Sequence, residues 1–443
     1  MIASVKGYVL YSLLIVSTIG FIILSITLYG IRSTLRSVSY TVHKAQAEDL
    51  AESGISRAEY FLNGNDGHSI SWETAHYEEP VDSFGNIVIQ VQQAGLFSRI
   101  VSIGKRKTFS DTVSGLVGRN VPDMFNHSMV LTSVSGGCLF LENTSVQGTI
   151  VLHHGFITNK PHGRRPLPGY EKKVRIVPSP KVPFDSVDFC ARIRSMMKAD
   201  SLTTGKGRST GTTYRLTSGS DSLFSSEIIT ISGDLYIDAP LSHKKICVTG
   251  NTYLTEKGSC NTVWLKAKKI NCTDAQSSHC LFIADSGIVI KGGWHNSQFI
   301  ATDSIKLLDN PGFGTANCVA TLRTTRKDSS FTGGIYFHNA NNIKGTLISL
   351  IDQKCIDAHL VPYDVSIVLE PGFHLKGYIV TDHDINIQKG TIEGGFWARS
   401  VVTKYDSVSY TNAMIGITIK ALKEEILFPL LGDPPVQVII SSL

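Results

Sequence analysis

The sequence predicts a mainly β protein with one long N-terminal α-helix, a small antiparallel sheet and a parallel β-helix. Three observations support this fold class. Residues Gly7 to Ile31 carry no charged side chain, a pattern with period two runs from Phe84 to Arg119, and a glycine-centred repeat returns between residues 146 and 398. Each observation corresponds to one part of the fold, and the parts follow each other along the chain.

The uncharged stretch predicts a membrane-spanning helix, because about 20 apolar residues suffice to cross a hydrocarbon core of about 30 Å. An amphipathic helical pattern then continues without a break. Its apolar residues recur at spacings of three and four, which is typical of one buried helix face: Ala47, Leu50, Ala51, Gly54, Ile55, Ala58, Phe61 and Leu62. We therefore expect a single helix from Tyr8 to Leu62, ended by the glycine- and asparagine-rich residues 63–67.

This N-terminal region resembles the minor pilins of type IV pili and the minor pseudopilins of type II secretion. The resemblance rests on the short basic leader ending in Lys6 and Gly7, on Tyr8, and on the stretch Ala45–Leu62. It implies that a prepilin peptidase cuts between Gly7 and Tyr8, which makes residues 1–7 a leader. It also implies a single-pass protein of the bacterial inner membrane with its N-terminus inside, although the positive charges on either side of the span do not themselves favour this orientation.

Ser12 departs from the pattern of the major pilins. Their fifth mature residue is a glutamate that pairs with the N-terminal amine of a neighbouring subunit, and Ser12 occupies that place when counting starts at Tyr8. An unpaired charge in lipid is costly, so the glutamate marks a subunit that must dock onto another. Its absence suggests a tip or initiator subunit, whereas a plain single-pass anchor is the alternative.

Residues 63–121 are expected to form a small antiparallel sheet. Ile87, Ile89 and Val91 alternate with polar residues, and residues 98–104 and 112–119 read as further short strands. The pattern resembles the sheet that packs on the helix in pilin-like domains. Such a sheet would bury the apolar stripe of residues 47–62.

Residues 122–410 are expected to form the parallel β-helix. A motif of the form apolar-x-Gly-x-apolar-apolar recurs, with Gly148, Gly233, Gly345, Gly377 and Gly394 at its centre. Equivalent residues repeat after 17 or 18 positions, as in the pairs Ile231 and Val248, Ile288 and Ile305, Leu375 and Ile392, and Ile367 and Ile385. A short period with a glycine at each corner is typical of a solenoid. A β-sandwich of many short strands is the alternative.

The turn length resembles bactofilin-like, polymer-forming solenoids more than the polysaccharide-cleaving β-helices. Residues 160–226 interrupt the repeat and read as an insertion that contains a short helix over 184–199. Residues 411–443 are expected to cap the solenoid or to form a tail.

Composition and charge limit the functions that the chain can have. A net charge of +5 does not indicate a nucleic-acid-binding surface. The eight cysteines form no CxxC pair and complete no zinc motif, so we expect no metal and no cofactor. Outside the cytoplasm they could form up to four disulfides, whereas burial as free thiols is equally compatible with a β core. Their pairing stays open.

Asp303, Asp382, His383 and Asp384 are the strongest candidates for chemistry at the surface. Carboxylates gathered on one face of a β-helix can do acid–base work, and Asp303 occupies the place equivalent to Asp382 when residues 299–303 are matched with 378–382. Ordinary turn residues are the more frequent explanation of such a cluster. Arg164 and Arg165 belong to a basic run, residues 160–175, that suits an acidic polymer or is simply a solvated loop.

We therefore expect a structural, pilin-like subunit rather than an enzyme. Its partners would be other pilin or pseudopilin subunits, the inner membrane and a surface polymer, with no nucleic acid. The alternative is a membrane-anchored β-helix that acts as an adhesin or a carbohydrate-active enzyme, the latter with a cleft lined by Asp303, Asp382 and Asp384.

Overall fold

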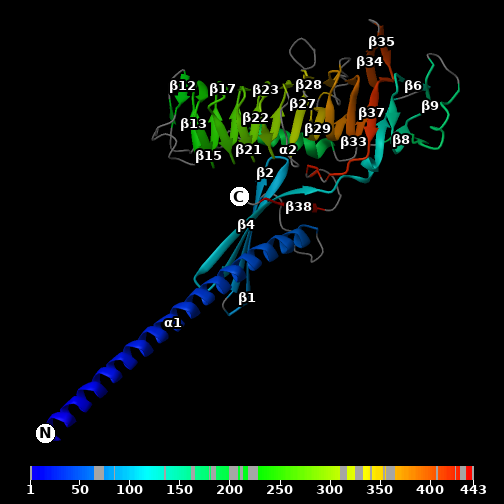
Figure 1. Cartoon of the computed structure of the whole chain (residues 1–443). Coiled ribbons are helices and arrows are strands. Elements are labelled where there is room, and N and C mark those ends of the chain that lie inside the picture. Colours follow the sequence, from blue (N-terminus) through cyan, green and yellow to red (C-terminus); the bar gives the residue numbers. More distant parts are fainter. Residues whose placement is uncertain are drawn as a thin grey trace. The chain divides into compact units, whose positions relative to one another are not determined.

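A computed structural model describes the chain as two compact units (Figure 1). Unit 1 comprises residues 1–92, 99–115 and 440–443, and unit 2 comprises residues 93–98 and 116–439. The description leaves out residues 1, 64–73, 84, 134–135, 161–164, 179, 181–185, 199–207, 210–212, 218–227, 310–316, 325–332, 340–341, 353–354, 356–364, 406–407, 425, 430–435 and 442–443.

Unit 1 is built from the long helix and the small antiparallel sheet, as the sequence predicts. The helix, α1, runs from Ile2 to Leu62, which makes it about 90 Å long at 1.5 Å per residue. Its sheet has the order β1-β2-β3-β4-β38. The bounds are β1 Thr74–Asp82, β2 Gly85–Ala94, β3 Phe97–Arg106, β4 Phe109–Arg119 and β38 Val436–Ser441.

The predicted apolar stripe is the face of α1 that packs on this sheet. Ala47, Ala51 and Ala58 are fully buried. The helix approaches β3 so closely that a Cβ on Gly104 would lie 2.0 Å from the carbonyl oxygen of Ala47. Small residues on both sides therefore set the distance between helix and sheet.

Unit 2 is the predicted solenoid, made of stacked parallel strands on several walls. The first wall is a sheet of 15 strands. Its main path is β10 Val174–Ile176, β8 Thr149–Leu152, β5 His127–Leu131, β33 Gly390–Ala398, β31 His374–Thr381, β29 Ile343–Ile351, β27 Cys318–Arg323, β25 Gln298–Ala301, β22 Leu281–Ala284, β19 Trp264–Ala267, β16 Lys245–Val248, β13 Ile228–Ile231 and β11 Arg208–Ser209, with β37 Ile417–Lys420 and β7 Ser145–Val146 beside it.

The second wall is a sheet of 11 strands. Its order is β12 Thr213–Leu216, β14 Asp234–Ile237, β17 Asn251–Leu254, β20 Lys269–Cys272, β23 Ile288–Lys291, β26 Ile305–Leu308, β28 Ile335–His338, β30 Ile367–Leu369, β32 Ile385–Ile387, β34 Val401–Tyr405 and β35 Val408–Thr411. Two short sheets complete the solenoid: β15 Pro240–Ser242, β18 Ser259–Asn261, β21 Gln276–Ser278 and β24 Trp294–His295, and then β36 Ala413–Ile415, β6 Gly137–Leu141 and β9 Phe156–Thr158.

The strand register confirms the period read from the sequence. Ile231 pairs with Val248, Ile288 with Ile305, Leu375 with Ile392 and Ile367 with Ile385. The inward residues of successive rungs, meaning successive turns of the solenoid, form one continuous aliphatic core. Each rung buries its inner face only by stacking on its neighbours, as in other solenoids.

Three of the repeat glycines form a ladder at one corner. Gly345 pairs with Gly377, and Gly377 pairs with Gly394, all with positive φ between 136° and 147°. A Cβ on Gly377 would lie 1.9 Å from the carbonyl oxygen of Gly345, which leaves no room for any side chain. The predicted role of glycine at the bends is thereby explained by both conformation and close approach.

The order of the rungs differs from the order of the sequence. The early strand β5 pairs with the late strand β33, and β8 and β10 then continue the stack beyond β5. The chain thus enters the solenoid at the end where the late rungs finish. The parallel pairing of β36 with β6 and of β37 with β33 and β7 extends the solenoid past residue 410, the limit that the sequence suggested.

The outer face of the first wall is covered. Helix α2, Ser186–Lys198, lies within the segment predicted as an insertion and buries Phe189, Cys190, Ile193 and Met196. These residues join a second hydrophobic core with outward residues of the wall such as Ile283, Ile300 and Ile348. The 3-10 helix η1, Asp123–Asn126, contributes Phe125 to the same core.

The turn between β2 and β3 and the C-terminal segment also cover this wall. The amide side chain of Gln298 accepts a hydrogen bond from the backbone N–H of Leu96 at 2.7 Å and donates one to the carbonyl of Ala94 at 2.6 Å. Leu427 and Phe428 are fully buried in the same core. The predicted tail is therefore part of the packing, and its last strand, β38, is placed in the small antiparallel sheet rather than on the solenoid.

Candidate functional site

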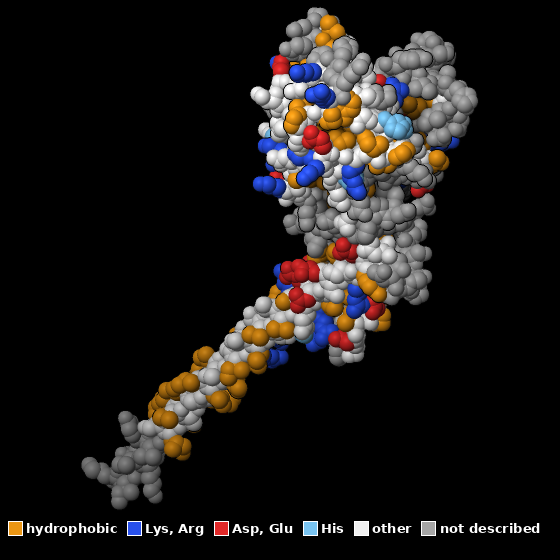
Figure 2. All heavy atoms as spheres, turned by 90° about the vertical axis from the view of Figure 1, so that its right-hand side faces the viewer, with side chains coloured by type: hydrophobic (Ala, Val, Ile, Leu, Met, Phe, Trp, Pro, Cys, Tyr) orange, Lys and Arg blue, Asp and Glu red, His pale blue; other side chains and the backbone are white. Residues whose placement is uncertain are grey.

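The first half of α1 is an apolar helix whose side chains are exposed. Leu10 is 69% exposed, Phe21 72% and Tyr29 77%, and large apolar side chains stay exposed as far as Val42 (Figure 2). The helix is long and apolar enough to cross a membrane. A soluble surface rarely shows so much contiguous apolar area, so this segment requires a cover, either lipid or other apolar helices.

Hydroxyl groups within this segment are already hydrogen-bonded inside the helix. The hydroxyls of Thr18, Thr27 and Thr34 donate to the carbonyls four residues earlier, at 2.7, 2.9 and 3.0 Å. In hydrocarbon an unsatisfied polar group costs several kcal/mol, so this internal bonding suits an apolar surrounding. The segment is thus chemically compatible with burial in a bilayer or a helical bundle.

The residues that the resemblance assigns to processing and docking lie at the start of this segment. Lys6, Gly7 and Tyr8 are in the first turns of α1. Ser12 follows within the exposed apolar stretch. No acidic residue precedes Glu48 in the sequence, so the apolar stretch carries no carboxylate.

Asp384 and His383, expected at the surface, are buried. Asp384 is 9% exposed and His383 is completely buried. The guanidinium group of Arg399 donates two hydrogen bonds of 2.8 and 2.7 Å to the Asp384 carboxylate, and the Ser400 hydroxyl donates a third at 2.7 Å. Although burial opposes ionisation, the bonds from Arg399 and Ser400 prevail and lower the pKa of Asp384. The expectation of a surface site is wrong here, because the two residues close a corner between the walls.

Asp382 is partly exposed as a residue, but Oδ1 of its carboxyl group is buried. One of its oxygens accepts a hydrogen bond from the backbone N–H of Ile351 at 2.9 Å. Burial raises its pKa to about 6, against the opposing effect of that bond and of the nearby Arg323. This buried corner continues to α2, where Arg194 donates to Asp352 from Nε at 2.9 Å.

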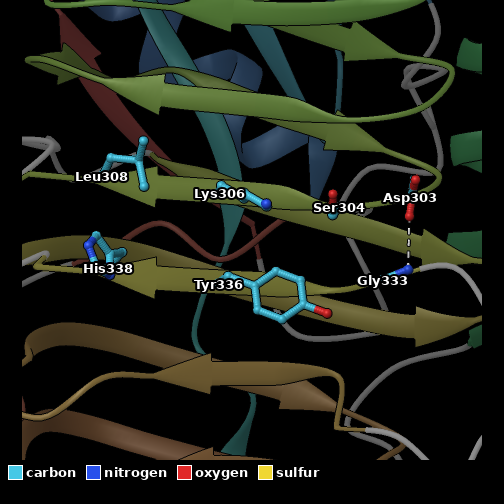
Figure 3. Close-up of a pocket in the computed structure, with 7 residues that line it drawn as sticks. All are labelled: Asp303, Ser304, Lys306, Leu308, Gly333, Tyr336 and His338. Atoms are coloured by element: carbon cyan, nitrogen blue, oxygen red, sulfur yellow. Dashed lines mark hydrogen bonds between the residues drawn. The ribbon is translucent and has the colours of Figure 1, made fainter.

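Asp303 lies apart from these residues, at the edge of a shallow hollow on the outside of the second wall (Figure 3). The hollow has a volume of about 500 Å³ and lies over β26 and β28. Its lining residues are Asp303, Ser304, Lys306, Leu308, Gly333, Tyr336 and His338. Asp303 accepts a hydrogen bond from the backbone N–H of Gly333 at 2.9 Å, so its carboxylate joins two rungs.

The register corrects the predicted equivalence of Asp303 and Asp382. Successive pairings place Phe299 in the same column as Ile379, not Tyr378, so the sequence match was displaced by one residue. Ile305 and Ile385 lie in one column, three rungs apart, which separates the neighbouring carboxylates of Asp303 and Asp382 by about 14 Å at 4.7–4.9 Å per strand. Paired glycosidase carboxylates lie within about 5–9.5 Å, so the described residues form no catalytic cleft from Asp303, Asp382 and Asp384.

Arg165 is exposed, whereas Arg164 lies outside the described residues. The segment around Arg165 covers one end of the solenoid. Leu167, Tyr170 and Val174 pack against the aliphatic core, and the backbone N–H of Leu167 donates to the carbonyl of Ile157 at 2.7 Å. We call residues 165–176 the end cap. From the sequence we expected residues 411–443 to form a cap. We did not expect one from the basic run, although its apolar residues Leu167, Tyr170 and Val174 are spaced so that all three contact the core.

The eight cysteines are all free thiols, and all except Cys247 are buried. Burial raises the pKa of Cys138 and of Cys260 to about 12, which keeps both protonated. The sequence left open whether the cysteines form disulfides or are buried as thiols, and the structure has them as thiols. Among the described residues, no group of three or more His, Cys, Asp or Glu side chains is arranged to hold a metal.

Comparisons with known proteins give little further guidance. No family model matches the chain, and no curated protein matches it. Among solved structures, the competence-associated pilin ComZ from Thermus thermophilus aligns over 90% of this chain and 97% of its own, with 9% sequence identity and a TM-score of 0.22. So low a score supports no conclusion about fold or function.

Proposed function

We propose that the chain is a pilin-like structural subunit that displays a β-helix outside the inner membrane. It would belong to a type IV pilus or a type II secretion pseudopilus, at or near the tip. The observation that carries the proposal is the division of α1 into two halves. Residues 10–42 expose apolar side chains, whereas the stripe of Ala47, Ala51, Ile55 and Ala58 is buried against the small sheet. One helix thus offers an apolar rod for lipid or partner helices and a firm attachment to a folded domain.

The tip position rests on Ser12 and on the size of unit 2, because a domain of residues 116–439 would clash if it were packed at every position of a filament shaft. Ser12 supplies no carboxylate to pair with a neighbouring amine, and the acid-free start of α1 offers no substitute. The partners would be pilin or pseudopilin helices that lie beside residues 8–42. The resemblance of the solenoid to bactofilin-like proteins stays a prediction, as does the cut after Gly7.

The test is the N-terminal sequence of the mature protein from membranes and from sheared filaments, in cells with an active prepilin peptidase. We expect a start at Tyr8 and recovery of the protein in the filament fraction. The variant Gly7→Leu should stay uncut with Met1 at its start. Gly20→Leu is the matched control, because nothing lies within 4 Å of a Cβ at that position, and it should be processed normally.

Immunogold labelling of filaments then tests the position. Label confined to filament ends agrees with a tip subunit, whereas label along the shaft contradicts it. A protein that starts at Met1 and is absent from filaments would leave a simple membrane anchor and would overturn the proposal.

A further inference from the structure

The end cap of the solenoid carries exposed positive charge that the rest of the structure does not neutralise. Lys160, just before the cap, and Arg165, Lys172 and Arg175 within it are exposed. None of these four forms an ion pair within the part of the chain that the structure describes. Figure 2 views the side on which β8 and β9 lie in Figure 1, and Lys and Arg side chains gather there among apolar ones.

Several cations of the second wall are paired. Lys291 lies 3.4 Å from Asp274 and 3.6 Å from Asp309, and Arg215 lies 3.1 Å from Asp238. Its other exposed cations, such as Lys269 on β20 and Lys306 on β26, lie on different strands, whereas the end cap gathers three within residues 165–176. The end cap has one acidic residue, Glu171, whose carboxylate accepts a hydrogen bond from the backbone N–H of Gly169 at 2.9 Å and so stabilises its own turn.

The packing of the cap holds its cations outward. Tyr170 packs edge-on against Phe140 with ring centroids 5.4 Å apart, and the ammonium group of Lys173 lies 5.0 Å from the Tyr170 ring. Arg175 is on β10, the terminal strand of the first wall, where it pairs with Val151 of β8. Partial burial and, to a smaller extent, the positive charge of Arg175 lower the pKa of His127 on β5, the strand on the other side of β8.

We propose that the end cap binds an acidic polysaccharide through Arg165, Lys172 and Arg175. Charge complementarity requires an anionic partner, because an exposed cluster of unpaired cations attracts anions and guanidinium groups fit carboxylates. The charge density favours a polysaccharide over nucleic acid. Duplex DNA carries one charge per about 1.7 Å and calls for a far more basic protein surface, whereas the whole chain has a net charge of only +5.

The test uses the full chain in nanodiscs of phosphatidylcholine, a lipid without net charge, and immobilised polygalacturonate as the probe. We expect binding that weakens as salt is raised, and no binding to neutral dextran. The triple variant Arg165→Ser, Lys172→Ser, Arg175→Ser should lose about tenfold in affinity, because three exposed charge contacts are removed.

The matched control removes the same charge elsewhere on the solenoid. Lys245, Lys257 and Lys269 are exposed and form no ion pair among the described residues, so Lys245→Ser, Lys257→Ser, Lys269→Ser has the same net charge as the cap variant. It should keep wild-type affinity within about twofold, the range typical of distant surface changes. Arg175→Lys, which keeps the charge, should also bind.

Three results would overturn the proposal. These are no binding to polygalacturonate, equal losses in the cap and control variants, and equal binding to dextran. Tighter binding of DNA than of polygalacturonate at the same salt would replace the polysaccharide by nucleic acid and would also overturn it. Because the cations are exposed, the cap variant should unfold at the wild-type temperature, and a shift of more than a few degrees would mean that the cap had lost its structure.

Discussion

The two main walls of the solenoid bury their strands differently. On the second wall, β23 and β26 alternate between a buried and a more exposed residue, so that one face meets the core and the other meets solvent. On the first wall, every residue of β22, β25 and β27 is buried. This part of the first wall is covered on its outer face by α2, the β2–β3 turn and residues 427–428, and it therefore lies between two cores, whereas β13 and β16 farther along the wall alternate like the second wall.

This difference predicts where the fold is most easily destroyed. Ile300 points to the outer core of the first wall and is fully buried, whereas Val289 is half-exposed on the outside of the second wall. We expect Ile300→Asp to cost more than about 4 kcal/mol of unfolding free energy, because a charge would be placed under α2. Val289→Asp should cost less than about 1 kcal/mol.

The measurement is denaturant unfolding of the full chain in detergent, followed by far-UV circular dichroism. If both variants lost the same stability, the outer face of the first wall would be solvated like that of the second, and the comparison would fail.

The glycine ladder tests how rigidly a corner of the first wall is built. Gly377 has a φ of 147° and lies under the carbonyl of Gly345, so we expect Gly377→Ala to cost about 3 kcal/mol through backbone strain and overpacking. Gly293→Ala is the control, because the nearest atom to its Cβ is 4.0 Å away, and it should cost less than about 1 kcal/mol. Thermal unfolding compares the two, and a tolerated Gly377→Ala would show that the corner can relax.

Asp382 lies where the two walls meet and should give the fold a pH dependence. Its pKa is raised to about 6 in the folded protein, above the ordinary value of 3.8, so the folded state holds the proton more tightly. Stability from this group is therefore fully present below about pH 4 and is lost as the pH rises through about 6.

Asp382→Asn removes that loss. The variant should be more stable than the wild type by about 2 kcal/mol at pH 8, and the gain should vanish near pH 4. Denaturant midpoints measured from pH 4.5 to 8 decide this, and parallel pH profiles for the two proteins would contradict the buried position of the carboxyl group.

Ion pairs should give the smallest difference between the walls. Arg194 joins α2 to Asp352, whose side chain is only 8% exposed, whereas Lys291 and its acidic partners are a third to a half exposed. Arg194→Met should cost about 1–2 kcal/mol, because it leaves a nearly buried carboxylate without that partner. Lys291→Met should cost less than about 0.5 kcal/mol. Equal costs in chemical unfolding would mean that α2 is held by its apolar residues alone.

Much of the architecture can be predicted from local sequence patterns. The helical stripe of residues 47–62, the alternation in residues 84–119, the period of the rungs and the glycines at the corners all follow from short-range rules about which face of an element is apolar. The candidate site was harder to predict from the sequence. Asp382, His383 and Asp384 have the composition of a surface turn, and only Arg399, Ser400 and Ile351, brought in from other rungs, convert that turn into a buried corner.

The one-residue displacement between Asp303 and Asp382 has the same origin. Rungs differ in length, because Ile305 pairs with Ile335 and Ile335 with Ile367, whereas other rungs repeat after 17 or 18 residues, so sequence similarity alone does not fix the register. In a strand a displacement of one residue exchanges the inner and outer faces, which is why this error changed the predicted site.

By itself, the sequence determined the long helix, the small sheet and the solenoid, because periodicity and glycine placement act within about 20 residues of chain. The tertiary structure decided three other features. Strand β5 stacks on β33, α2 covers the first wall, and β38 joins the small sheet of unit 1. These features depend on contacts between distant segments, and the apolar residues that make them match many partners equally well until the whole fold selects one.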